Sequence, residues 1–173
     1  MSEKPEHMTH LRGDTLVPKS HPIIFLRGKL DSLGAQIVLI QCDLADMGAD
    51  PALLADLQEI LEILGEIMRA EVKEDALARD SVLGLTWAEI RAQSHAPQKY
   101  FGVRALTPPD RSLGRTYALL NALRAAIRET ELAAVKAFDT KRPDLTLALN
   151  RLSSAVYILM CRTVKEECRG VEE

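Results

Sequence analysis

Four long stretches of this 173-residue chain repeat apolar residues at the three- and four-residue spacing of an α-helix. This spacing constrains the fold most, because an amphipathic helix must bury its apolar stripe against other elements. The predicted helices run from about Pro22 to Met47, Leu53 to Met68, Arg111 to Phe138 and Asp144 to Glu167. Aromatic residues make up only 4% of the chain, which favours helix packing over a β-sandwich. No segment is convincing as a strand.

Helix-start signals refine these boundaries and add one short helix. The signals are Ser20 with Pro22, Asp50 with Pro51, and Thr86 with Glu89. The last pair is a capping box and predicts a short helix over 84–94. The next twenty or so residues, "HAPQKYFGVRALTPPDRSLG", lack periodicity and are typical of a functional loop. We therefore expect an all-α, five-helix up-and-down bundle over 22–170, with four long helices and one short one, preceded by an extended N-terminal arm over 1–21.

Charge and cysteine content narrow the class of partner. A formal net charge of −3 gives no broad basic surface for nucleic acid or an anionic membrane. No run approaches the roughly 20 apolar residues that a membrane span requires. Cys42, Cys161 and Cys168 lie far apart and form no CxxC pair, so neither a disulfide framework nor a structural metal site is predicted. These features predict a cytoplasmic protein without nucleic-acid or membrane partners.

Three charged residues in "RAAIRETE" share one face of the predicted helix 111–138. Arg124, Arg128 and Glu131 fall within roughly 60° of one another on a helix. One interpretation is a surface pair between Arg128 and Glu131, contributing roughly a few tenths of a kcal/mol. The other is a pair of guanidinium groups that bind a polyphosphate, with Glu131 orienting them or contacting the nucleotide.

Other polar residues lie among the apolar residues of the predicted helices. In "ALNRLSSAVYILM", Asn150 and Ser154 share a side of the last helix, and a buried amide there needs partners from other helices or from a ligand. Asp31 lies between Leu30 and Leu33 in the first helix. Its carboxylate needs a cation, and an arginine of the charged stripe could supply it within the chain or across a subunit boundary.

Three motifs resemble those of the helical-bundle ATP:cob(I)alamin adenosyltransferases, and they follow one another along the chain in the order and spacing of that family. "ALNRLSSAVYILM" resembles the N-R-L-S-D helix of that family, with Ser154 in place of Asp. "RAAIRETE" is similar to its R-x-x-x-R-R-A-E-R helix, with Glu129 and Leu132 replacing two arginines. "VPKSHPIIFLRGKLDSL" is similar to the entry of its first helix, matching at Lys19, Pro22, Gly28, Asp31 and Leu33. Segments such as "SHAPQKYFG" resemble the ethanolamine-utilization branch, and the likeness extends from about Lys4 to about Lys165.

The resemblance implies a homotrimer with active sites between subunits. The ATP ligands it implies are Lys19, Arg128, Glu131 and Asn150, with Mg²⁺ on the phosphates. Arg151 is expected to point away from the nucleotide, and Ser153 and Ser154 to pack near a subunit seam.

The resemblance also implies a corrinoid side to each site. Asp31 and Arg124 would form an intersubunit salt bridge beside the cobalamin substrate, so that the implied catalytic set is Asp31, Arg124 and Arg128. Tyr100 or Phe101, on the long loop, is the candidate for an aromatic wall that displaces the lower axial ligand of cobalt.

The implied reaction joins the 5′-deoxyadenosyl group of ATP to cob(I)alamin and releases triphosphate. Such an enzyme would supply ethanolamine ammonia-lyase, receive electrons from a flavin reductase, and work in the cytoplasm with a possible place in a bacterial microcompartment. An alternative is a non-catalytic helical module that binds corrinoid or ATP and delivers it to a partner. The alternative is motivated by Leu132 at an arginine position and by the phosphate-binding arm, which keeps Gly13 and Asp14 but lacks the next glycine of the family.

Overall fold

The computed structural model describes residues 4–103 and 110–169, with side chains described up to residue 164. The fold is mostly helical, as predicted. Its helices are α1 (Pro22–Asp46), α2 (Pro51–Lys73), α3 (Trp87–His95), α4 (Pro97–Phe101), the 3-10 turn η1 (Arg111–Leu113), α5 (Gly114–Phe138) and α6 (Pro143–Arg169). Residues 1–3 of the predicted arm, 104–109 of the predicted loop and residue 170 of the predicted domain lie outside the described residues.

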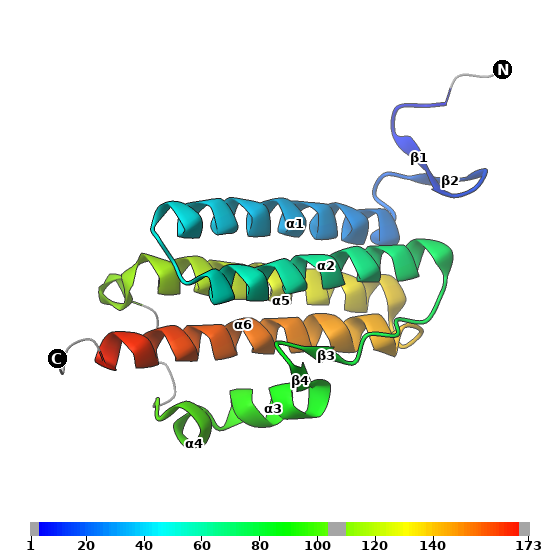
Figure 1. The fold of residues 1–173 in the computed structure, drawn as a ribbon. Coiled ribbons are helices and arrows are strands. Elements are labelled where there is room, and N and C mark those ends of the chain that lie inside the picture. The colour runs from blue at the N-terminus through cyan, green and yellow to red at the C-terminus, as the bar shows by residue number, and fades with distance from the viewer. Residues whose placement is uncertain (1–3, 104–109, 170–173) are drawn as a thin grey trace.

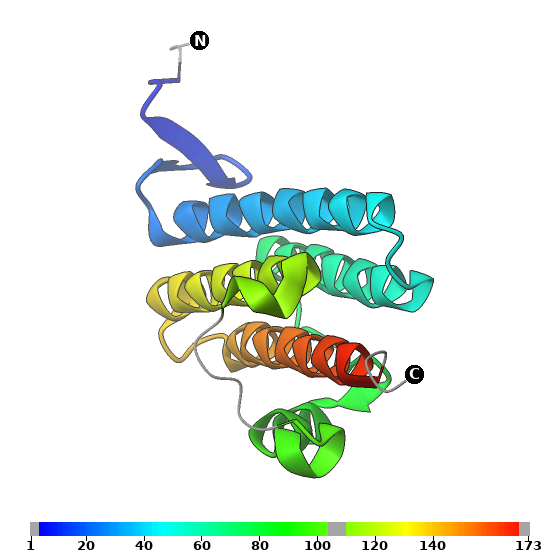
Figure 2. The same cartoon turned by 90° about the vertical axis from the view of Figure 1, so that its left-hand side faces the viewer.

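The four long helices form a bundle in which α5 has its main contacts with α6 and α1, and α2 packs on α1. The shorter α3 covers the outer side of α6, so that α1, α5, α6 and α3 follow one another from top to bottom in both Figure 1 and Figure 2. The helices α1, α2, α3, α5 and α6 alternate in direction along the chain (Figure 1). These five helices follow the predicted up-and-down order, and α4 is a sixth, short helix that the sequence did not indicate.

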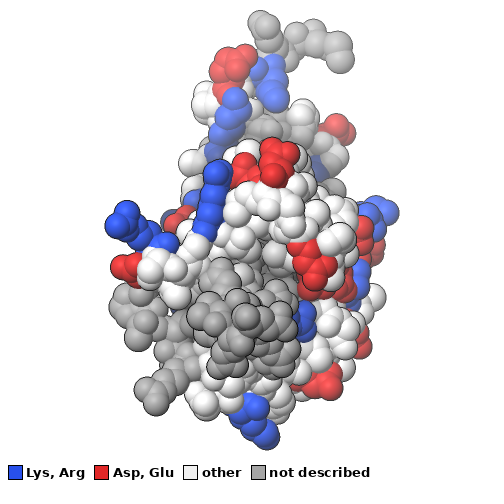
Figure 3. Space-filling model, turned by 60° about the vertical axis from the view of Figure 1, so that its left-hand side comes forward, with Lys and Arg blue, Asp and Glu red and all other residues white. Residues whose placement is uncertain are grey.

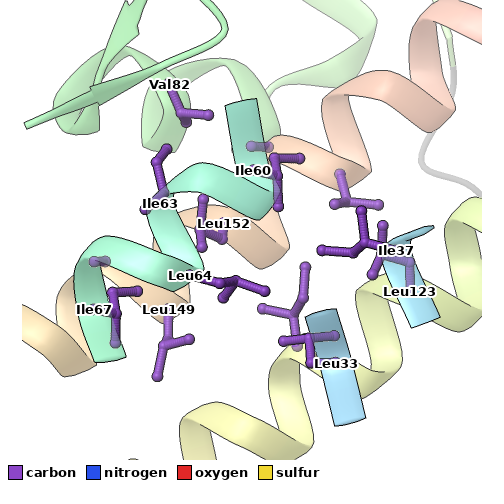
Figure 4. Close-up of a cluster of buried hydrophobic side chains, with 14 of the residues drawn as sticks. Leu33, Ile37, Ile60, Ile63, Leu64, Ile67, Val82, Leu123, Leu149 and Leu152 are labelled. Atoms are coloured by element: carbon purple, nitrogen blue, oxygen red, sulfur yellow. The ribbon is translucent and has the colours of Figure 1, made fainter. Parts of the chain in front are cut away.

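One hydrophobic core joins the helices (Figure 4). Leu33 and Ile37 of α1 meet Ile60 and Leu64 of α2, while Leu123 comes from α5. Leu149 and Leu152 of α6 close the cluster, and Val82 covers its edge. Within the described part of the chain, no helix is both long enough and apolar enough to cross a bilayer.

Two of the predicted helix starts are confirmed and one is wrong. Asp50 caps α2 by accepting a hydrogen bond from Ala52 N at 2.8 Å, and Thr86 and Glu89 form the capping box of α3. At α1, however, the cap is His21 instead of Ser20, since the His21 Nδ1 accepts from Ile23 N at 3.2 Å. Pro22 occupies the first turn as predicted, where its missing N–H is not needed.

The expectation of a chain without strands is wrong. The arm forms an antiparallel hairpin of β1 (Met8–Arg12) and β2 (Thr15–Pro18), whose turn contains Gly13 at φ +48°. A second small hairpin pairs β3 (Ser81–Val82) with β4 (Leu85–Thr86). Such short strands carry too few alternating residues to give a period-two signal, and backbone pairing alone defines them.

The stretch after α3 also differs from the predicted loop. It contains α4, a single short helix that begins at Pro97 and ends before Gly102 at φ +71°. Both positions follow ordinary helix rules, since proline suits a first turn and glycine a left-handed end. A segment this short is not stable as an isolated helix. It is helical here because it packs on α6.

Candidate active site

A hydrogen-bonded pair joins α5 to α6 at the site that the sequence indicated. Asn150 Nδ2 donates to Glu131 Oε1 at 2.8 Å, and both side chains are half-buried. Arg128 and Glu131 form no ion pair among the described residues, so the surface-pair interpretation of the sequence is not realised. The pair borders a shallow cavity of about 530 Å³, which is also lined by Asp139, Thr140, Pro143, Thr146 and Leu147.

Arg151 fixes the orientation of the Asn150 amide. The expectation that Arg151 points away from the nucleotide stays a prediction. Its Nη1 donates to Asn150 Oδ1 at 2.5 Å, so the amide oxygen is occupied and one amide proton is directed to Glu131. The other amide proton of Asn150 is the group that can meet a ligand. Burial lowers the pKa of Arg151, the charge of Arg91 lowers it further, and Glu131 opposes both effects.

The two serines of this helix are satisfied locally. Ser153 Oγ donates to the Asn150 carbonyl oxygen at 2.8 Å, and Ser154 Oγ to the same oxygen at 3.3 Å. Bonds of this kind to the preceding turn let a buried helix accept hydroxyl groups without an unpaired polar atom. The apolar run "ALNRLSSAVYILM" therefore tolerates polar residues because each has a partner on its own helix or on α5.

Arg124 and Arg128 of α5 line a second hollow, of about 130 Å³, along the same contact between α5 and α6, called the α5–α6 seam. Arg124 is half-buried and donates from Nε and Nη2 to Asn121 Oδ1 at 3.2 and 3.0 Å. Arg128 is exposed and has no hydrogen bond or ion pair with another described residue, so its five donors face the hollow or solvent. The remaining lining residues are Ser94, His95, Ser153, Ser154 and Tyr157.

Sequence reasoning missed Ser94 and His95 as neighbours of these arginines. They end α3, and they reach the seam because α3 packs on α6. The only signal was that Ser94 ends the predicted helix 84–94 and His95 follows it, which does not show what that helix packs against. On α5, the buried Tyr117 has its pKa raised by desolvation and by Tyr157, while Arg124 lowers it.

Asp31 borders the groove between α1 and α2 and does not meet Arg124 or Arg128 of its own chain. Its side chain is exposed in an apolar groove between α1 and α2, lined also by Gly34, Gly65 and Met68. It takes part in none of the ion pairs formed by the described residues. The intrachain pairing with Arg124 that the sequence left open is therefore absent there.

Lys19 is likewise separate from the seam in this single chain. It follows β2 on the hairpin that projects beyond the start of α1 (Figures 1 and 2), and its side chain is exposed. Its backbone N donates to His7 O at 2.8 Å, which closes the base of the hairpin. Neither cavity of the α5–α6 seam includes Lys19.

The two aromatic candidates lie on α4 instead of a loop. Tyr100 is 40% exposed, whereas Phe101 packs against the hydrophobic core. Their ring centroids are 6.5 Å apart at an interplanar angle of 47°, and Lys99 Nζ lies 5.1 Å from the Tyr100 centroid. Tyr100 is therefore the ring available to a ligand, and Phe101 anchors α4.

An anionic ligand of the α5–α6 seam would be attracted by individual basic side chains there, because the formal net charge of the chain is −3. On the face shown in Figure 3, basic and acidic side chains are interspersed and neither sign dominates. No cluster of three or more His, Cys, Asp or Glu side chains that could bind a metal ion occurs among the described residues.

Comparison with known proteins identifies the family. The sequence profile of the family described as "Cobalamin adenosyltransferase" matches residues 1–163. The chain belongs to the cobalamin adenosyltransferase family. Its similarity to the Corrinoid adenosyltransferase EutT of Salmonella typhimurium is 42% identity over 94% of this chain and 60% of that protein. The protein of the same name from Escherichia coli is 38% identical over 100% of this chain and 64% of its own length. The chain thus spans less than two thirds of these cobalamin adenosyltransferase relatives.

Proposed function

We propose that this chain transfers the 5′-deoxyadenosyl group of ATP to cob(I)alamin. The observation that carries the proposal is the polar seam of α5 and α6, which brings Arg128 and the Glu131–Asn150 pair, the residues that the sequence motifs indicated, to one side of the bundle. The family match over residues 1–163 supports it. The names of its relatives, corrinoid adenosyltransferases, agree with it. The proposal covers the substrates as well as the reaction.

ATP binding is assigned to Lys19, Arg128, Glu131 and Asn150. Arg128 and Lys19 would make charge-assisted contacts with the phosphates, which are stronger than neutral hydrogen bonds. Asn150 would offer its second amide proton, held in place by Glu131 and Arg151. Mg²⁺ is expected on the phosphates and would arrive with the nucleotide, because the described residues present no carboxylate cluster to hold it alone.

The proposed reaction requires the two substrates to be positioned in line, and it requires no general base. The cobalt(I) electron pair attacks C5′ of ATP, the Co–C bond forms, and the C5′–O bond breaks with its electron pair leaving on triphosphate. Cobalt passes from Co(I) to Co(III) as the bond forms. Because the nucleophile is an electron pair on cobalt, no proton has to be removed from it. The protein contributes in-line alignment and charge on the leaving group, which Arg128 and Lys19 supply.

Tyr100 is the better candidate for the wall that displaces the lower cobalt ligand, because its ring is exposed while Phe101 is held by the core. An apolar wall there would exclude water from the cobalt face. A four-coordinate cobalt(II) centre that forms beside it is easier to reduce, which would help the flavin reductase expected as electron donor.

A homotrimer with active sites between subunits is part of the proposal. The outer face of α5 exposes Ala118, Ala122, Ala125 and Val135, together with Leu132 at 69% exposure. On α1, Val38 and Leu39 are 46% and 62% exposed near Asp31. Apolar faces of this kind favour burial against a second copy, which would let Asp31 of one subunit reach Arg124 of the next and bring Lys19 toward a neighbouring seam.

The product is proposed to supply ethanolamine ammonia-lyase, in the cytoplasm or in a bacterial microcompartment. The support is the motif likeness to the ethanolamine-utilization branch and the name shared by the relatives.

An anaerobic assay with chemically reduced cobalamin and Mg-ATP tests the activity. We expect the visible spectrum of cob(I)alamin to convert to that of adenosylcobalamin, with one triphosphate released per Co–C bond. ATP binding without any Co–C spectrum would overturn catalysis and favour the delivery module, which the Leu132 departure motivated. Absence of both ATP and corrinoid binding would overturn the whole proposal.

A further inference from the structure

Glu71 is a fully buried carboxylate that the proposed chemistry does not use. It lies in the last turns of α2 with 0% exposure. Its Oε2 accepts from Arg27 Nε at 2.6 Å, and its Oε1 accepts from Arg12 Nη2 at 2.8 Å and from Arg27 Nη2 at 3.3 Å. Both oxygens are therefore satisfied within the protein, which leaves no ligand position and makes the cluster a structural fastening.

The three residues of this cluster come from three elements. Arg12 is the last residue of β1, Arg27 lies in the second turn of α1, and Glu71 is on α2. The bonds also extend to the backbone, since Arg12 Nη2 donates to Glu71 O at 3.0 Å and Arg27 Nη1 donates to Leu11 O at 2.9 Å. The N-terminal hairpin is thereby tied to both helices at once.

The hairpin has little else to hold it. No residue of β1 or β2 is fully buried, and the hairpin projects past the end of the bundle (Figures 1 and 2). Because the hairpin buries no side chain fully, its orientation depends largely on the polar contacts at its base. Burying a carboxylate is costly unless it is well paired, so a buried cluster at this joint favours a specific geometry more than it adds stability.

We propose that Glu71, with Arg12 and Arg27, is a positioning residue that sets the angle of the N-terminal hairpin and thus the place of Lys19 in the nucleotide site. Lys19 lies at the foot of β2, and its backbone bond to His7 fixes it to the same hairpin. The inference rests on the proposed function for its ATP consequence. The fastening of the hairpin itself does not depend on that function.

The test replaces Arg12, because this member of the cluster lies on the hairpin and its loss leaves the residues of α1 and α2 in place. Arg12→Met keeps an unbranched apolar stem but removes the guanidinium group with its charge and donors, while Glu71 stays paired with Arg27. In the full chain we expect the KM for ATP to rise about tenfold or more, as the loss of a charged hydrogen bond implies. The KM for cob(I)alamin should change less than about twofold.

Two further variants make the test specific. Glu74→Gln is the matched control, because it removes the negative charge of the exposed partner that Arg12 Nη1 bonds at 2.5 Å and leaves Glu71 untouched. It should leave the KM for ATP within about twofold of the parent. Arg12→Lys keeps a cation at the same place and should recover part of the ATP affinity lost in Arg12→Met. Equal effects of Arg12→Met and Glu74→Gln would overturn the role assigned to Glu71.

Hydrogen exchange gives a readout that does not need activity. Arg12→Met should speed amide exchange in the hairpin over residues 8–19 and leave α1 and α2 unchanged. Unchanged hairpin exchange would overturn the fastening. Faster exchange with unchanged ATP affinity would overturn the link to Lys19, provided that the parent binds ATP. A parent that binds no ATP would instead refute the proposed function, while the exchange result would still decide the fastening.

Discussion

Some side chains of the α5–α6 seam are already hydrogen-bonded to one another, whereas Arg128 has no such bond among the described residues. Glu131 and Arg151 each hold one end of the Asn150 amide, so this amide is oriented before any ligand arrives. Arg128 has no partner among the described residues and is exposed beside them. An oriented amide next to an unengaged guanidinium is suited to binding, because the ligand need not displace an existing ion pair.

Arg128→Ala should weaken ATP use. Loss of one charge-assisted contact corresponds to about 1.5–3 kcal/mol, so kcat/KM for ATP should fall on the order of tenfold to a hundredfold. Arg69→Ala on α2 is the control, because that arginine is also exposed and lies away from the seam. Steady-state kinetics with saturating cob(I)alamin measures the effect. Unchanged ATP kinetics in Arg128→Ala would refute the assigned role.

The helices were predictable from the sequence, and several of their junctions were not. Apolar periodicity marked every long helix, and the start signals placed α2 and α3, because both are local properties of the chain. The hairpin of β1 and β2 and the packing of α4 depend on contacts with distant segments. For the same reason the charged stripe of α5 could be read from spacing, whereas His95 beside Arg124 required knowledge that α3 covers α6.

The junction before α6 makes stability depend on acid pH. Arg142 donates from Nε and Nη2 to Asp144 at 3.0 and 2.9 Å, and Leu77 N donates to the same carboxylate at 3.0 Å. These bonds lower the pKa of Asp144 from 3.8 to about 2, with the Arg142 hydrogen bond as the main cause. A depressed carboxyl pKa stabilises the fold above pH 3.8, and the gain is lost as the pH falls toward 2.

Asp144→Asn should therefore lower the free energy of unfolding by about 2 kcal/mol near pH 7. The difference from the parent should shrink as the pH falls below about 4. Urea unfolding followed by circular dichroism across this range measures it. Asp80→Asn is the control, since that exposed carboxylate lies in the connection between α2 and β3 that also contains Leu77, and it forms none of the described ion pairs. A difference independent of pH would contradict the assignment to the Asp144 charge.

In the proposed trimer, candidate residues that lie apart in one chain could come together. In one chain Asp31 lies in the α1–α2 groove and Arg124 on the α5–α6 seam. Lys19 stands on the projecting hairpin (Figure 1). The exposed apolar faces of α1 and α5 adjoin these positions, so association of copies through them would close sites that a single chain leaves divided. Sequence spacing could not test this proposal, because in the proposed trimer the relevant distances lie between chains.

Asp31→Asn should impair corrinoid use or trimer formation more than ATP affinity, because it removes one charge of the proposed intersubunit pair and leaves the ATP ligands in place. Asp46→Asn, on the last residue of α1, is the control for loss of an exposed carboxylate. We expect kcat/KM for cob(I)alamin to fall about tenfold or more while the ATP Kd changes less than about twofold. Sedimentation velocity reports the oligomer in the same samples.

A charge exchange decides whether Arg124 is the partner. Asp31→Arg and Arg124→Asp should each disrupt the assembly or its corrinoid kinetics, since each places like charges together across the interface. Combining them restores opposite charges and should recover part of both properties, as a coupling energy in a double-mutant cycle. Strictly additive losses would show that the two residues do not meet. Equal loss of ATP and corrinoid affinity in Asp31→Asn would instead make Asp31 a general structural residue of α1.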